Sequence, residues 1–87
     1  MSKIRILLAD DHGVVRKGLR FLLEQHPQME IVGEASDGRE AVRLAAELKP
    51  NVVVMDIGMP NLNGIEATAQ IVKQNPHVHV IVLSVHS

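Results

Sequence analysis

The chain has 87 residues, of which 46% are hydrophobic and 22% charged, with no cysteine and a formal net charge of -1. This length allows one domain, and the composition is that of an ordinary globular protein rather than a disordered one. The small net charge excludes a strong overall attraction to nucleic acid, and the lack of cysteine excludes disulfides and thiolate metal sites. No apolar run approaches the ~18 residues of a membrane-spanning helix, so the sequence predicts a cytoplasmic protein that does not contact the membrane.

The chain begins with a mostly apolar strand over residues 4–9, which ends at Asp10 and Asp11. A helix is expected after Gly13 and before Pro27. Its apolar residues recur at helical spacing: Val15, Leu19, Leu22 and Leu23. The one basic cluster of the chain lies on the same segment and is made of Arg16, Lys17 and Arg20. Three cations on one helix are usually its solvated face, so we do not expect them to bind nucleic acid.

The middle of the chain predicts an edge strand and a second helix. Residues 31–35 read as a short strand, interrupted by Gly33 and flanked by Glu30 and Glu34, as is typical of a sheet edge. Asp37 and Glu40 have the spacing of a helix capping box. The helix after them has one apolar stripe and ends before Pro50: Ala41, Leu44, Ala45 and Leu48.

The last third of the chain contains its most apolar strand. Residues 52–55 are apolar without interruption, which is typical of a parallel strand covered on both faces. This strand ends at Asp56, and a loop with Gly58 follows. Asn63 and Glu66 form a second capping box. The helix behind it is expected to bury Ile65, Ala69 and Val72, and a fourth strand over residues 78–83 ends at Ser84. Four strands alternating with three helices predict an α/β domain with a doubly wound parallel sheet.

Polar side chains follow three of the predicted strands and converge at one edge of such a sheet: Asp10, Asp11, Asp56 and Ser84. Ligands of open α/β sheets bind at this edge. Three carboxylates repel one another unless a cation lies between them, and Mg²⁺ prefers oxygen ligands of this kind. An aspartate beside Mg²⁺ can also act as a nucleophile towards phosphorus. His12 and His86 could line the same crevice, and no two histidines have the i, i+4 spacing of a helical zinc site.

Three motifs resemble the receiver domain of bacterial two-component response regulators, above all those with a LuxR-type helix-turn-helix output domain. They are ILLADDH at residues 6–12, VVVMDIGMPNLNGIEA at 52–67 and VIVLS at 80–84. The resemblance implies a flavodoxin-like fold and a role in phosphorelay signalling and transcription regulation. The chain would then be a signalling domain rather than an enzyme.

The resemblance also implies a role for each site residue. Asp56 would accept a phosphoryl group from the histidine of a sensor kinase. Asp11, Asp56 and the backbone carbonyl of Gly58 would bind Mg²⁺, and Asp10 would help to hold the ion through a water molecule. Ser84 would be the hydroxyl that turns inward when Asp56 is phosphorylated, and DNA would be bound only through an output domain outside this chain.

Receivers of this kind continue with a fourth helix, a fifth strand bearing a lysine and a fifth helix. Residues 1–87 are therefore expected to form the N-terminal part of a receiver, and no lysine here matches that of the fifth strand. The strand at 78–83 is expected to be a free edge through which the chain forms a homo-oligomer. Two alternatives stay open at this point: a fragment that acts only as an interaction or assembly module, and a Mg²⁺-dependent phosphohydrolase that forms an aspartyl phosphate. The hydrolase would need an aspartate at position 58, where this chain has Gly58.

Overall fold

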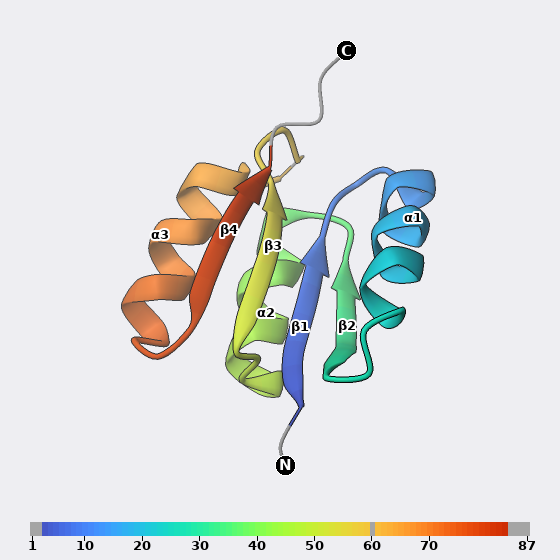
Figure 1. Cartoon of the computed structure of the whole chain (residues 1–87). Helices are drawn as coiled ribbons and strands as arrows, with labels where there is room; N and C mark the ends of the chain where they lie inside the picture. The colour runs from blue at the N-terminus through green and yellow to red at the C-terminus, as the bar shows by residue number, and fades with distance from the viewer. Residues whose placement is uncertain (1–2, 60, 84–87) are drawn as a thin grey trace.

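The computed structural model describes residues 3–59 and 61–83, which form a parallel sheet of four strands with helices on both faces (Figure 1). The strand order is β2-β1-β3-β4. The strands are β1 (Ile4–Ala9), β2 (Met29–Ala35), β3 (Val52–Asp56) and β4 (His79–Leu83). The helices are α1 (Gly13–Glu24), α2 (Gly38–Leu48) and α3 (Gly64–Gln74). The element order and the doubly wound parallel sheet predicted from the sequence are confirmed.

The two faces of the sheet are covered by different helices because alternate side chains of each strand point to opposite sides. Leu7 and Ala9 of β1 lie in the larger core, which α2 and α3 cover with Ala41, Ala45 and Ile71. On the other face, Ile6 and Leu8 pack with a second cluster that includes Leu19 and Leu23 of α1. Strand β1 is thus buried on both faces from Ile6 to Ala9, whereas Val52 and Val54 of β3 are only partly buried on the face that carries α1.

Both predicted capping residues lie at the N-termini of their helices. The side chain of Asp37 accepts a hydrogen bond from the backbone N–H of Glu40 at 2.8 Å, and that of Asn63 accepts one from Glu66 at 2.9 Å. In α2 the reciprocal bond is displaced by one residue, since the Glu40 carboxylate accepts from the N–H of Ser36 and not from that of Asp37. These caps fix where α2 and α3 begin.

The prediction of which side chains α3 buries is wrong. Ile65, Ala69 and Val72 are exposed, and the helix instead buries Gly64, Ala67 and Ile71. The sequence of α3 contains two apolar stripes, and periodicity alone does not say which of them meets the sheet.

Smaller differences concern α1 and β2. Leu22, one of the apolar residues that recur at helical spacing, is 61% exposed. Helix α1 ends at Glu24, three residues before Pro27. Strand β2 is an edge strand, as predicted, but it begins at Met29, and its register against β1 shifts between Ile6 and Leu7. The shift lies beside Gly33, which pairs with Leu7. The strand is therefore distorted near Gly33 but does not end there.

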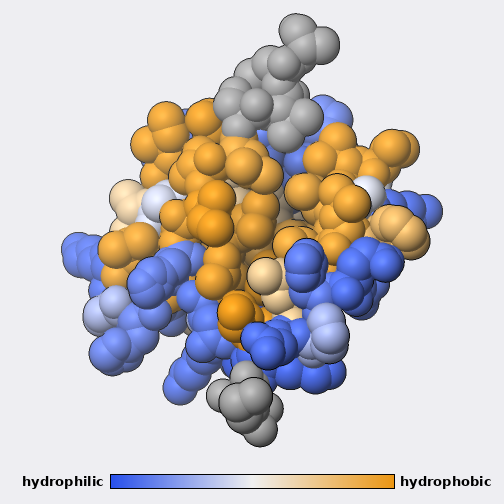
Figure 2. Space-filling model, in the orientation of Figure 1, coloured by the Kyte–Doolittle hydropathy of each residue, from blue (hydrophilic) through white to orange (hydrophobic). Residues whose placement is uncertain are grey.

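Apolar side chains cover much of the sheet face that is turned to the viewer in Figure 2. Ile81 of β4 pairs in register with Val54, on the face that carries α1, and is 51% exposed. In the described part of the chain, β4 pairs with one strand only, β3. No helix in that part is long and apolar enough to span a bilayer.

Candidate functional site

Strands β1 and β3 are neighbours, and their carboxyl ends bring the predicted aspartates together. Asp10 directly follows β1 and is 2% exposed, while Asp56 ends β3 and is 4% exposed. One carboxylate oxygen from each of Asp10, Asp11 and Asp56 and one ring nitrogen of His12 lie within 4.8 Å of one another. The predicted meeting of the three carboxylates is confirmed, and the group has a composition that could hold a metal ion.

The loop between β1 and α1 is fixed by the Asp10 carboxylate. Asp10 Oδ1 accepts hydrogen bonds from the backbone N–H of His12 at 2.7 Å and from its Nδ1 at 2.9 Å. The first bond spans two residues, which is the geometry of an Asx turn. The backbone N–H of Asp10 donates to the carbonyl of Ala35 in β2 at 3.0 Å. Side chain and backbone of Asp10 are therefore both anchored.

The sequence predicted only that His12 could line the crevice, but its ring lies directly against the carboxylates. Its Nδ1 is 3.1 Å from Asp11 Oδ1 and 3.9 Å from Asp56 Oδ2. The hydrogen bond to Asp10, together with the negative charge of Asp11, holds the pKa of His12 above its usual value. The sequence signal for this residue was its position directly after the two aspartates at a strand end.

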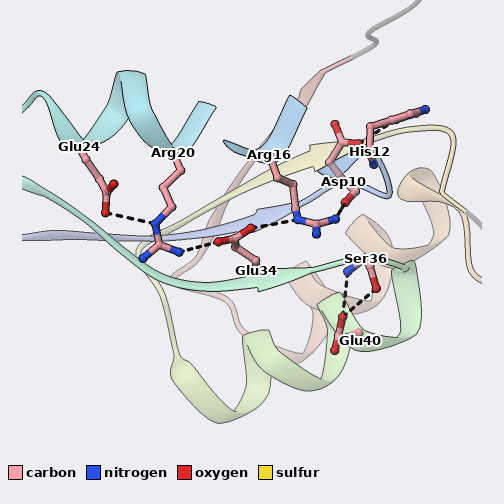
Figure 3. A network of polar contacts seen from close by, with 8 residues as sticks. All are labelled: Asp10, His12, Arg16, Arg20, Glu24, Glu34, Ser36 and Glu40. Carbon is pink, nitrogen blue, oxygen red and sulfur yellow. Dashed lines mark hydrogen bonds and ion pairs between the residues drawn. The ribbon is translucent and has the colours of Figure 1, made fainter. Parts of the chain in front are cut away.

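Arg16 connects the site to the outer strand of the sheet (Figure 3). Its Nη1 donates to the backbone carbonyl of Asp10, and its Nε donates to Glu34 of β2 at 3.0 Å. Arg20 donates to the other oxygen of Glu34 and, through Nε, to Glu24 at 3.2 Å. The bond from Arg20, with help from Arg16, lowers the pKa of the Glu34 carboxyl. Two members of the basic cluster are thus ion-paired with the sheet, which corrects the expectation of a solvated face.

The loop after β3 passes very close to the backbone of Asp56. A Cβ atom on Gly64 would collide with the Asp56 carbonyl oxygen and lie 2.7 Å from the Cα of Ile57. The N–H of Gly64 donates to the carbonyl of Ile57 at 2.9 Å. Gly58 lies in the turn directly after β3. Two predicted residues of this crevice, Ser84 and His86, lie outside the described residues.

A profile of the response regulator receiver domain matches residues 6–87. The chain belongs to this family. The receiver is 53% identical to the transcriptional regulatory protein LiaR of Bacillus subtilis over 81 residues, which are 93% of this chain and 38% of LiaR. The response regulator domain of Thermotoga maritima CheB superposes with a TM-score of 0.91 at 50% identity, covering 94% of this chain and 60% of that one. A LuxR-family response regulator from Aurantimonas sp. SI85-9A1 superposes with a TM-score of 0.91 at 42% identity. The match covers 99% of this chain and 61% of that regulator's chain.

The family and the geometry together identify the receiver domain of a two-component response regulator, and the buried aspartate at the end of β3 fits the phosphoacceptor of such a domain. The flavodoxin-like order β2-β1-β3-β4 agrees with these relatives. The match to the receiver-domain family favours a receiver domain over the alternative of a Mg²⁺-dependent phosphohydrolase. The receiver chain spans between 36% and 39% of three of the regulators that it matches. Its relatives include a protein-glutamate methylesterase as well as transcriptional regulators, so their output activities differ.

Proposed function

We propose that Asp56 accepts a phosphoryl group from the phosphohistidine of a sensor histidine kinase, and that Mg²⁺ is held by Asp10, Asp11, Asp56 and the backbone carbonyl of Gly58. The observation that carries this proposal is the state of Asp56. Its side chain is 4% exposed, and one of its oxygens lies within 4.8 Å of an oxygen of Asp10 and of one of Asp11. Carboxylates this close together repel one another unless a cation lies between them.

In the proposed transfer, an oxygen of Asp56 attacks the phosphorus atom of the phosphohistidine. The new P–O bond forms as the P–N bond breaks, and the histidine leaves with that electron pair and takes up a proton. Asp10 and Asp11 orient the reacting groups, and Arg16 holds the backbone that carries Asp10. When bound, Mg²⁺ would offset the negative charge of the carboxylates and of the phosphoryl oxygens.

The rest of the proposal concerns the whole protein. Residues 1–87 form the N-terminal part of the receiver, Ser84 responds to phosphorylation, and the complete protein is cytoplasmic. Phosphorylation of Asp56 controls a DNA-binding output domain, for which the likeness to the transcriptional regulator LiaR gives support. The domain acts as a signalling module and not as an enzyme.

Labelling with a small phosphodonor in the presence of Mg²⁺ tests the acceptor. We expect a stable phosphoryl adduct by intact-mass spectrometry, and none on Asp56→Asn. Asp37→Asn is a matched control, since Asp37 caps α2 and is not a member of the cluster, and asparagine also caps helices. Labelling of Asp56→Asn would show that another residue is the acceptor. No adduct on the unaltered chain would favour the interaction-module alternative.

A second proposal is that the 87-residue chain forms a homodimer through β4. This strand has no charged side chain and no proline, and its far edge has no partner strand among the described residues. Unpaired backbone groups on such a strand are a template for a second chain. A two-fold axis would pair both edges at once, either edge to edge or by exchange of β4.

A further inference from the structure

Asn63 and Gly64 form the one Asn-Gly pair of the chain. The other asparagines precede a larger residue or a proline: Asn51, Asn61 and Asn75. The backbone nitrogen of a glycine is poorly shielded, because glycine has no Cβ atom, and it can attack the side-chain amide of a preceding asparagine. Asn63 is therefore the asparagine of this chain that is most prone to spontaneous deamidation.

The reaction has two steps. A bond forms between the Gly64 nitrogen and Cγ of Asn63, the bond from Cγ to the side-chain nitrogen breaks, and that nitrogen leaves as ammonia with the proton of the Gly64 N–H. Water then opens the cyclic imide at one of its two carbonyl carbons. Opening at Cγ gives aspartate. Opening at the backbone carbonyl gives isoaspartate, in which the main chain runs through the former side chain and is one carbon atom longer.

The fold holds both reacting groups in other bonds. Oδ1 of Asn63 accepts a hydrogen bond from the backbone N–H of Glu66 at 2.9 Å and so caps α3. The N–H of Gly64 donates to the carbonyl of Ile57 at 2.9 Å and thereby retains the proton that the first step removes. The loop between β3 and α3 must therefore open before the imide can form.

The closed loop has no space for a longer main chain. Gly64 is buried, and a Cβ atom on it would lie 2.7 Å from Cα of Ile57 and collide with the carbonyl oxygen of Asp56. Isoaspartate inserts its additional carbon atom directly before this glycine and also removes the side chain that caps α3. Aspartate does neither, since its carboxylate accepts hydrogen bonds at a helix start as asparagine does.

We propose that Asn63 is a site of spontaneous deamidation controlled by opening of the loop between β3 and α3, and that isoaspartate at this position displaces the strand end at Asp56. Because the loss of ammonia is irreversible, the modified chain accumulates with the time that the loop spends open. Neither a phosphoryl group nor a metal ion takes part in this reaction.

Ageing of the 87-residue chain at mildly alkaline pH, folded or in urea, tests the control by the fold. Peptide mapping by mass spectrometry should show deamidation of Asn63 about tenfold slower or more in the folded chain, because only the open fraction reacts. Equal rates in the two states would overturn the proposal.

Two variants separate opening of the loop from unfolding of the whole chain. Asn61 ties the loop to the start of α2, since its Nδ2 donates to Oδ2 of Asp37 at 3.0 Å, and its φ angle of 70° suits glycine. Asn61→Gly should raise the rate at Asn63 about threefold or more in the folded chain and leave the rate in urea unchanged. Glu34→Gln is the control, since Glu34 pairs with α1 and not with the loop. An unchanged rate in Asn61→Gly, or an equal rise in Glu34→Gln, would show that the loop does not control the reaction.

The effect of isoaspartate is measured on the aged chain after chromatographic separation of its two products. Asn63→Asp is the matched control, because it has the same added charge with a main chain of normal length. The isoaspartate product should shift the NMR signals of Asp56 further than Asn63→Asp does, and it should unfold at a lower urea concentration. Identical Asp56 signals in the two proteins would contradict the proposed displacement.

Discussion

The backbone around Asp56 leaves room only for a neighbour without a side chain, which is Gly64. Gly64, the first residue of α3, lies so close to the Asp56 carbonyl that a Cβ atom has no room. Its φ angle is negative, so space is the constraint here, not conformation. The glycine allows the loop between β3 and α3 to close against the strand end that carries the proposed phosphoacceptor.

We therefore expect Gly64→Ala to lower the free energy of unfolding by about 1–3 kcal/mol, as overpacking does. It should also shift the NMR signals of Asp56, because the strand end has to move. Gly13→Ala is the control. Gly13 is likewise the first residue of its helix, but a Cβ atom there would meet no atom within 4 Å. Equal stability of the two variants in urea titrations would contradict this account of Gly64.

At the scale of elements, the ion pairs of Glu34 join α1 to β2. The Arg20 and Arg16 pairs lower the pKa of the Glu34 carboxyl. They therefore stabilise the fold fully at pH values above 4.5, the ordinary pKa of this group. This stability is lost as the pH falls through the lowered pKa of the folded state.

We expect Glu34→Gln to lower the free energy of unfolding at neutral pH by about 1 kcal/mol, since the pairs are partly exposed to solvent. The difference from the unaltered chain should shrink as the pH is lowered below 4.5. Glu47→Gln removes a more exposed pair, with Arg43 within α2, and should change stability less. A Glu34→Gln deficit that does not depend on pH would show that packing, and not charge, is responsible.

The elements also show what sequence patterns can and cannot predict. The four strands, the two caps and the meeting of Asp10 with Asp56 followed from local patterns and from the rule that parallel strands end at one edge. The buried face of α3 did not, because Ala67 and Ile71 compete with a second stripe that is equally apolar. The pairing of Arg16 with Glu34 was also missed, since it joins residues 18 positions apart across two elements.

At the scale of the whole molecule, the proposed dimer depends on the edge of the sheet at β4. Ile81 is half exposed on this strand, whereas the neighbouring Val80 packs against the core. We expect Ile81→Lys to weaken the proposed dimer, because a charge on an edge strand opposes pairing. Val72→Lys places the same charge on an exposed position of α3 and should leave association unchanged. Light scattering over a dilution series measures both, and a monomer at all micromolar concentrations of the unaltered chain would show that β4 does not mediate association.

The central claim is that the carboxyl ends of β1 and β3 form a metal-dependent phosphoacceptor site. Titration of the ¹⁵N-labelled chain with Mg²⁺, followed by NMR, tests it most directly. The account predicts saturable shifts of the signals of Asp10, Asp11 and Asp56, since the cation relieves the repulsion among their carboxylates. These shifts should be lost or much reduced in Asp56→Asn. A titration that leaves all three signals unmoved, or that moves them equally in Asp56→Asn, would contradict the account.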